Sequence, residues 1–284
     1  MIKFLEQLPH FLFFTGKGGV GKTSLACATA VQLADSGKRV LLVSTDPASN
    51  VGQVFGMTIG NKITPFDSVP RLSGLEIDPQ AAAQLYRDKI VGPVRGVLPE
   101  SVVKGIEEQL SGACTTEIAA FDEFTALLTD EVIQRDFDHV IFDTAPTGHT
   151  LLLLDATGAY HRETARQLGP SGISFTTPMM QLQDSKKTKI LIVTLAENTP
   201  VLEAAGLQSD LRRADIEPWA WIINNSLAIA NPTSPLMRQR ASNELAQIDA
   251  VTKQYAKRWA VVPLQAQEPI GVERLKKLAS HFAS

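Results

Sequence analysis

Short apolar runs that end in small or polar residues recur along the chain and alternate with longer segments of helical periodicity. Such runs are typical of strands buried on both faces of a parallel sheet, and the segments between them are typical of crossover helices. The sequence therefore predicts an α/β fold with a doubly wound, mainly parallel sheet. Strands are expected at 11–15, 39–45, 75–78, 139–143, 189–195, 220–224 and 260–263, and helices at 22–35, 79–91, 100–110, 115–134, 158–167, 200–213, 235–257 and 271–282.

One long segment departs from this alternation. Residues 79–135 carry helix signals and no strong strand, which predicts a helical subdomain inserted beside the sheet. No low-complexity linker interrupts the chain, and neither its glycine loop nor its aspartate motif occurs twice. We therefore expect residues 1–284 to form one domain with a helical insertion.

Composition and charge exclude several classes of protein. With 44% hydrophobic and 20% charged residues, the chain has the profile of a globular protein with a sizeable core. A net charge of −3 gives no general attraction to nucleic acid. Its longest apolar runs, at 11–14 and 151–154, are far shorter than the ~20 residues of a membrane span. Glu6, Pro9 and His10 interrupt any signal peptide. We expect a cytoplasmic protein without a nucleic-acid partner.

A glycine-rich motif follows the first predicted strand and precedes the first predicted helix. The motif fits G-x-x-x-x-G-K-[ST], in which backbone N–H groups and the helix N-terminus bind phosphate. Lys22 would add positive charge at the phosphates, and the Thr23 hydroxyl suits Mg²⁺. A chance match is set aside because both the strand and the helix are in place. The predicted ATP-binding residues are Gly16, Lys17, Gly18, Gly19, Val20, Gly21, Lys22, Thr23 and Ser24.

Two aspartates end predicted strands, at the sheet edge where open α/β folds bind their ligands. Asp46 follows the second strand and could orient or deprotonate an attacking water, or, as an Asx turn or helix cap, organise the chain before Pro47. The two roles can coexist. Asp143 ends the strand at 139–143 and is a candidate Walker B carboxylate for Mg²⁺. With Thr23, these aspartates form the predicted magnesium site.

Lys17, directly after the first glycine, turns the motif into the deviant Walker A form K-G-G-V-G-K-T. This form resembles the nucleotide-switch family that includes the arsenical pump ATPase, the tail-anchored protein targeting factor, the Min and Par ATPases and the nitrogenase iron protein. The resemblance implies that Lys17 reaches across a dimer interface to the nucleotide of the second subunit; otherwise it is a solvated loop lysine. The run D-T-A-P-T-G-H-T at 143–150 narrows the resemblance to the arsenical pump ATPase and the tail-anchored protein targeting factor.

The resemblance also implies how the nucleotide is used. Asp46, Lys17 and Lys22 would be the catalytic residues, and loss of the γ-phosphate would release both switch loops. Asn224, at the end of a predicted strand, and the loop that begins at Pro263 resemble the adenine pocket of the family. An asparagine at this position can equally be a turn residue.

The chain has two cysteines, and they have different surroundings. Cys114 lies in a segment, 111–124, that resembles the metalloid site of the arsenical pump ATPase, and sulfur suits trivalent arsenic or antimony. An inert residue at a helix start is the alternative. His149 could ligate the same metalloid or relay the nucleotide state to it; a histidine satisfied by local hydrogen bonds is the alternative. Cys27, on the helix after the glycine loop, is expected to be buried.

Taken together, the resemblance implies an ATPase that energises arsenite or antimonite efflux by a membrane permease. Expected ligands and partners are ATP, Mg²⁺, arsenite or antimonite, a second copy paired through the nucleotide face, the permease at the inner membrane and an arsenic metallochaperone. The alternative is an ATP-dependent targeting chaperone for tail-anchored membrane proteins. Up to about Thr150 the chain resembles the first half of the two-domain pump ATPase, and from Leu151 the second, which suggests a hybrid.

Overall fold

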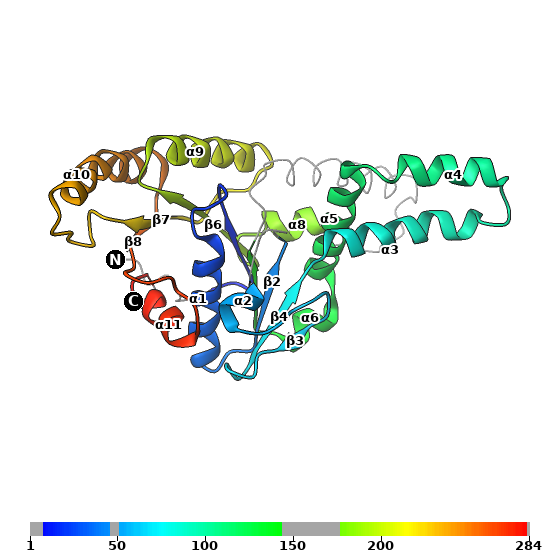
Figure 1. The fold of residues 1–284 in the computed structure, drawn as a ribbon, viewed down its shortest axis with the longest axis horizontal. Helices are drawn as coiled ribbons and strands as arrows, with labels where there is room; N and C mark the ends of the chain where they lie inside the picture. The colour runs from blue at the N-terminus through cyan, green and yellow to red at the C-terminus, as the bar shows by residue number, and fades with distance from the viewer. Residues whose placement is uncertain (1–7, 46–50, 144–176, 283–284) are drawn as a thin grey trace.

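The computed structural model describes residues 8–45, 51–143 and 177–282. Its eight strands form one sheet in the order β3-β4-β2-β5-β1-β6-β7-β8, and every neighbouring pair is parallel except β3 and β4 (Figure 1). The strands are β1 (Phe11–Thr15), β2 (Val40–Ser44), β3 (Thr64–Pro65), β4 (Leu72–Glu76), β5 (His139–Asp143), β6 (Thr188–Leu195), β7 (Ala220–Ser226) and β8 (Trp259–Pro263). The predicted α/β fold is confirmed.

Helices cover both faces of this sheet, as the doubly wound pattern predicts. Among the described residues, no helix is long and apolar enough to cross a membrane. The helices are α1 (Lys22–Asp35), α2 (Val51–Phe55), α3 (Pro79–Val91), α4 (Glu100–Gln109), α5 (Ala113–Thr129), α6 (Glu131–Asp136), α8 (Pro178–Gln183), α9 (Asn198–Arg213), α10 (Pro235–Ala250) and α11 (Val272–Ala279), with a 3₁₀ turn η1 (Gly92–Val94) and a π-helical turn η2 (Val251–Tyr255).

Alternating side chains of the strands feed two hydrophobic cores, one on each face of the sheet. On one face, Leu12 and Phe14 of β1 pack with α1, α2 and α11. On the other face, Phe11 and Phe13 pack with α5, α6, α8 and α9. Phe13 stacks on Phe142 with ring centroids 4.5 Å apart. Burial on both sides explains why these strands read as continuous apolar runs.

Several predicted boundaries differ from the structure. The strand expected at 75–78 is β4 and begins at Leu72, because Ser73 and Gly74 interrupt its apolar run. The helix expected at 115–134 is two helices, because the Asp130 carboxylate accepts hydrogen bonds from the backbone N–H groups of Val132 and Ile133 and caps α6. The short elements β3, α2 and α8 were not predicted. The helix expected at 158–167 lies outside the described residues.

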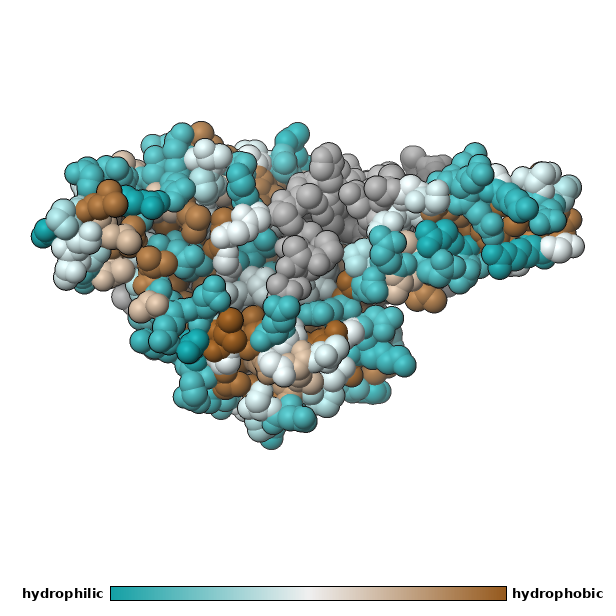
Figure 2. All heavy atoms as spheres, viewed as in Figure 1, coloured by the Kyte–Doolittle hydropathy of each residue, from teal (hydrophilic) through white to brown (hydrophobic). Residues whose placement is uncertain are grey.

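Two of the helices between β4 and β5, α3 and α4, extend away from the sheet. In Figure 1, α3 and α4 lie side by side as a projecting hairpin, and α5 returns the chain toward the sheet. The hairpin exposes apolar side chains among its polar ones, as Figure 2 shows for one face. Val97, in the connection between α3 and α4, is 77% exposed, and Leu85 of α3 is 58% exposed.

Candidate nucleotide site

The predicted phosphate loop connects β1 to α1 at the carboxyl end of the central strand. Gly16 has a φ of 145°, and a Cβ on it would lie 2.2 Å from the carbonyl oxygen of Val193 in β6. Only glycine fits a backbone pressed this closely against the neighbouring strand. By contrast, a Cβ on Gly18 or Gly19 would meet nothing within 4 Å, so this part of the loop faces open space.

A buried amide fixes the other end of the loop. Asn224 Nδ2, at the end of β7, donates a hydrogen bond of 2.9 Å to the carbonyl oxygen of Val20. Gly21, the next residue, has a φ of 90°, and a Cβ there would lie 2.2 Å from the same Nδ2. Asn224 is 4% exposed, and its Oδ1 atom has no hydrogen-bond partner among the described residues. The amide therefore holds the loop and keeps an acceptor at the site.

Three of the predicted ligands of phosphate and magnesium, Lys22, Thr23 and Asp143, have their side chains at the start of α1. The Thr23 hydroxyl donates a 2.6 Å hydrogen bond to Oδ2 of Asp143, the last residue of β5. Lys22 Nζ donates a 3.2 Å hydrogen bond to the carbonyl oxygen of Lys17, so the loop folds back over the Lys22 side chain. Lys22 and Asp143 are buried, at 4% and 0% exposure. A cation and a carboxylate with a hydroxyl thus lie beneath the glycine loop.

The residues just before Asp46 are hydrogen-bonded to β5, the strand that ends at Asp143. Ser44 of β2 is paired with Asp143 of β5, and the backbone N–H of Thr45 donates a 3.0 Å hydrogen bond to the carbonyl oxygen of Asp143. Asp46 itself lies outside the described residues. The end of β2, just before Asp46, is therefore the neighbour of Asp143 at the carboxyl end of the sheet.

Lys17, the signature lysine of the deviant Walker A motif, has a partner that the sequence did not suggest. Lys17 Nζ lies 2.8 Å from both carboxylate oxygens of Glu203, in the second turn of α9. Both side chains are about half exposed, at 44% and 45%. The Lys17 side chain therefore points to a helix of its own chain.

The residues expected at the adenine base lie on neighbouring strand ends. Asn224 is in β7 and Pro263 ends β8, where it is paired with Ser226. The N–H of Leu264 donates to the carbonyl oxygen of Ser226 at 3.0 Å. The Ser226 hydroxyl and the N–H of Ala228 both donate to Glu244 Oε2 of α10. Glu244 thus fixes the loop after β7, a contact between distant segments that no local sequence signal indicated.

The candidate metalloid residues are only partly described. Cys114 is the second residue of α5, so it lies inside the first helical turn and not before it, but its side chain is outside the described part of the structure. His149 lies outside the described residues. Among those described, no group of three or more His, Cys, Asp and Glu side chains could hold a metal ion.

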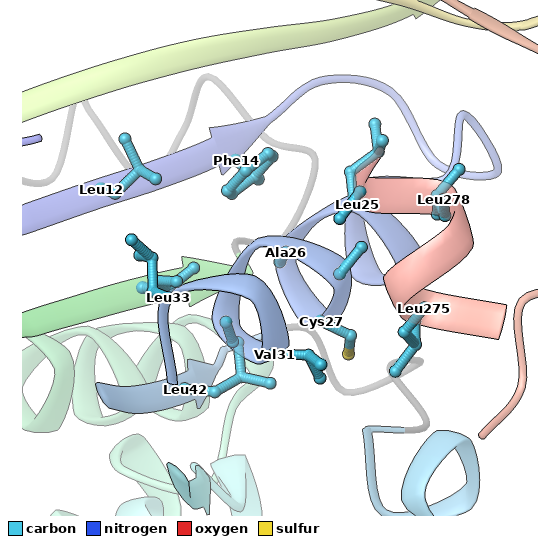
Figure 3. Close-up of a cluster of buried hydrophobic side chains, with 14 of the residues drawn as sticks. Leu12, Phe14, Leu25, Ala26, Cys27, Val31, Leu33, Leu42, Leu275 and Leu278 are labelled. Atoms are coloured by element: carbon cyan, nitrogen blue, oxygen red, sulfur yellow. The ribbon is translucent and has the colours of Figure 1, made fainter. Parts of the chain in front are cut away.

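Cys27 is buried, as the sequence predicted. Its side chain is 0% exposed and lies between Val31 and Leu275, in the core shared by α1 and α11 (Figure 3). Burial, with the charge of Asp143 as a smaller cause, raises the pKa of the Cys27 thiol well above its ordinary value. The thiolate needed to bind a metalloid is therefore disfavoured at this position.

Comparison with known proteins points to one family. A family model described as anion-transporting ATPase matches residues 9–169 and again residues 157–284. The two matches overlap and together extend over nearly the whole chain.

Individual relatives agree with this match. The arsenical pump-driving ATPase of Escherichia coli is 32% identical over 583 aligned residues, which cover 98% of this chain and 100% of that protein. The arsenical pump-driving ATPase of Acidiphilium multivorum is 32% identical over 584 residues, with the same coverage. ATPase GET3 of Mycosarcoma maydis is 27% identical over 319 residues, or 98% of this chain and 92% of that protein.

The Escherichia coli alignment is much longer than this chain. Since the chain has 284 residues, at least 299 of the 583 aligned positions (583 minus 284) hold a residue of the relative and none of this chain. The aligned region reaches both ends of the relative and nearly both ends of this chain. The unmatched positions are therefore internal to the relative.

Proposed function

This chain belongs to the anion-transporting ATPase family, and on that premise we propose that its ATP hydrolysis drives export of arsenite or antimonite through a membrane permease. The ATPase activity itself follows from the family. The substrate rests on one observation, the similarity over 98% of this chain to arsenical pump-driving ATPases of two bacteria. The permease is proposed because these relatives are pump-driving ATPases, a name that implies a separate pump.

The residues at the start of α1 fit Mg-ATP. Hydroxyl and carboxylate oxygens are the ligands that Mg²⁺ prefers, and Thr23 and Asp143 bring one of each within 2.6 Å. The open loop at Gly18 and Gly19 leaves room for phosphate, which its backbone N–H groups and the N-terminus of α1 would bind. Lys22 adds a buried positive charge at this point.

Mg-ATP supplies the phosphoryl group and the charge neutralisation that its transfer to water requires. Lys22 would stabilise negative charge on the phosphates, while Thr23 and Asp143 hold the ion. Asp46, which follows the anchored Ser44 and Thr45, would orient the attacking water. Lys17 would act on the nucleotide of a second subunit, where a further positive charge stabilises the transition state.

The adenine base is proposed to bind beside Asn224 and Pro263. Because the Nδ2 of Asn224 is engaged by Val20, its Oδ1 is the atom that can accept a hydrogen bond from the adenine amino group. Binding of adenine would thus be coupled to the phosphate loop through the Asn224 side chain.

We propose that the active form is a symmetric pair of chains joined through the nucleotide face. At least 299 internal positions of the Escherichia coli relative have no counterpart here, and the family model matches the chain in two overlapping parts. Both findings support a chain that combines the start and the end of a longer pump ATPase, within residues 1–284 as one domain. A second copy would supply what the missing segment provides in the relative.

The metalloid is proposed to bind between two such chains, through Cys114 and His149 of each. Cys114 lies in the first turn of α5, where the helix dipole favours a thiolate. Cys27 is sealed in the core and is no second ligand. Two Cys114 thiolates, one per chain, would give a soft trivalent arsenic or antimony its sulfur ligands, with His149 completing the site.

The protein is further proposed to work at the cytoplasmic face of the inner membrane, in contact with the permease. An arsenic metallochaperone could deliver the metalloid to the same site.

The decisive measurement is the ATPase rate with and without antimonite. We expect antimonite to raise the rate of the wild-type chain and to have little effect on Cys114→Ser. Cys27→Ala is the matched control, since it removes the other thiol and should leave the stimulation in place. A rate that antimonite does not change in the wild-type chain would contradict the pump assignment.

The alternative function, a targeting chaperone for tail-anchored membrane proteins, has one specific observation in its favour. The α3–α4 hairpin exposes several apolar side chains that could bind an apolar client: Leu85, Ile90, Val97, Leu98 and Val102. ATP-dependent binding of a tail-anchor peptide, lost in Leu85→Ser/Val97→Ser, together with antimonite-insensitive hydrolysis, would favour this alternative.

A further inference from the structure

We propose that Glu203 is a positioning residue for Lys17: it holds the signature lysine against α9 in the unpaired chain and releases it when a second copy joins. This inference rests on the proposed pairing through the nucleotide face. Glu203 is assigned no role by the family match or by the sequence motifs. Its contact with Lys17 spans 186 positions of the chain.

The geometry of the contact gives Lys17 one defined direction. Nζ lies 2.8 Å from both oxygens of the Glu203 carboxylate, which therefore receives the ammonium as a forked acceptor. Lys22 Nζ holds the carbonyl oxygen of Lys17 at 3.2 Å, so the lysine backbone is fixed while its side chain extends to α9. The ammonium group cannot contact Glu203 and the phosphates bound to a second subunit at the same time.

The elements that carry the two residues are rigidly joined. The loop before Lys17 is pressed onto β6 at Val193, and α9 follows β6 directly. Val201 and Ala204 of α9, on either side of Glu203, are buried in the core beneath the sheet. The backbone at Glu203 therefore stays at a fixed place beside the phosphate loop, and only the two side chains must move to break the contact.

The exposure of the pair makes the contact weak enough to be reversible. Both side chains are nearly half exposed, and ion pairs in such surroundings contribute little because water competes for them. A restraint of this kind changes an equilibrium by about two- to five-fold. It would limit premature pairing while allowing Mg-ATP to overcome it.

The test compares Glu203→Gln with Asp210→Asn, each of which removes one negative charge. Asp210 lies two turns further along α9 and pairs with Arg213, so it controls for charge on the same helix without touching the loop. Association is measured by sedimentation against concentration with Mg-ATP. Because a symmetric pair releases two such contacts, we expect the association constant of Glu203→Gln to be about four- to twenty-five-fold higher than that of the wild-type chain, and Asp210→Asn to match the wild type.

Two further readouts separate this role from a structural one. In a Lys17→Met background, Glu203→Gln should have no effect on association, because the restrained group is gone. In the nucleotide-free chain, the rate at which an amine-reactive acetylating reagent modifies Lys17, measured by mass spectrometry against the other lysines, should rise in Glu203→Gln but not in Asp210→Asn.

Each result has a distinct meaning. Weaker or unchanged association in Glu203→Gln, an effect that persists in Lys17→Met, or unchanged labelling of Lys17 overturns the proposal. A wild-type chain that never pairs with Mg-ATP overturns the proposed pairing instead, and the labelling result then still decides whether Glu203 holds Lys17.

Discussion

At the scale of single residues, the phosphate loop depends on backbone space as much as on charge. Gly16 is enclosed by the carbonyl oxygen of Val193, and Gly21 by the amide of Asn224. The loop is thus shaped by two strands that follow it by more than 170 positions in the sequence. The sequence motif identifies the required glycines, but it does not show that Val193 and Asn224 are the neighbours that leave no room for a side chain.

Gly21→Ala should weaken nucleotide binding. An alanine there would need a φ near 90° and would bring its Cβ within 2.2 Å of Asn224 Nδ2, so either the loop or the asparagine must move. We expect a loss of ATP affinity of about tenfold or more, measured by calorimetry, since the displaced loop carries the N–H groups that are proposed to bind phosphate.

Gly37→Ala is the matched control, because Gly37 has a φ of 88° and a Cβ there would meet nothing within 4 Å. It should cost stability of about 1 kcal/mol or more without changing ATP affinity. Equal ATP affinities in the two variants would show that the contact with Asn224 is irrelevant to binding.

Lys17→Ala should separate binding from turnover. The proposed role of Lys17 is at the nucleotide of a second chain, whereas Lys22 lies beneath the loop of its own chain. We therefore expect Lys17→Ala to lose most of its ATPase rate while its affinity for ATP changes little, and Lys22→Ala to lose the affinity itself. Substantial turnover in Lys17→Ala would refute the role in trans.

At the scale of helices and strands, most elements were predictable because their apolar runs are buried on both faces. The departures have local physical causes. β4 was placed about three residues late because it contains Gly74, where a Cβ would lie 2.6 Å from the Phe66 ring. The strand β3 has two residues, one of them a proline, and so leaves no periodic signal.

The parts of the candidate site that lie within one local motif, such as Thr23 and Asp143, were predictable from the sequence. The positions of Thr23 and Asp143 follow from strand ends, and the structure brings their side chains to 2.6 Å. The contacts of Lys17 with Glu203 and of Asn224 with Val20 span 186 and 204 positions, and no periodicity reports a pairing of single side chains at such separations.

The amino ends of β1 and β5 should make stability depend on pH. His10 and His139 lie there, half-buried, and burial is the main cause that lowers the pKa of each below 6.5. The unfolded chain binds these protons near pH 6.5, while the folded chain binds them only at lower pH. Stability should therefore fall as the pH is lowered from about 7.5 to 5.5.

Urea unfolding of His10→Asn/His139→Asn tests this expectation, because the double variant should lose stability less steeply over the same range. Asp138 does not confuse the result. Hydrogen bonds from Arg39 lower the pKa of its carboxyl group from 3.8 to about 2, so its contribution is lost only in strong acid. An identical slope in the variant and the wild type would contradict the assignment to the histidines.

At the scale of the whole molecule, the candidate nucleotide-binding elements all lie at the carboxyl end of the sheet. The phosphate loop follows β1, Asp143 and Pro263 end β5 and β8, Asn224 lies in the last three residues of β7, and α9 follows β6 beside them. A second copy that approaches this end would meet the loop and α9 together.

Mg-ATP should therefore change the assembly of the chain. Sedimentation of the wild-type protein is expected to give its own mass of 30.8 kDa without nucleotide and twice that mass with a non-hydrolysable ATP analogue and Mg²⁺. Lys22→Ala, which should not bind the nucleotide, is the control and should keep the lower mass. A wild-type chain that keeps the lower mass with the analogue would contradict the pairing.

The two margins of the sheet restrict how copies can meet. The outermost strand on one side, β3, has only two residues and includes Pro65, while β8 on the other side ends in Pro263. Proline has no N–H to donate, and the two-residue margin at β3 offers few free backbone groups to a strand from another molecule. Continuous intermolecular sheets, and the fibrous aggregates that grow from them, are disfavoured. Growth of such sheets would need both margins, whereas contacts through loops and helices do not, and a nucleotide can reverse them.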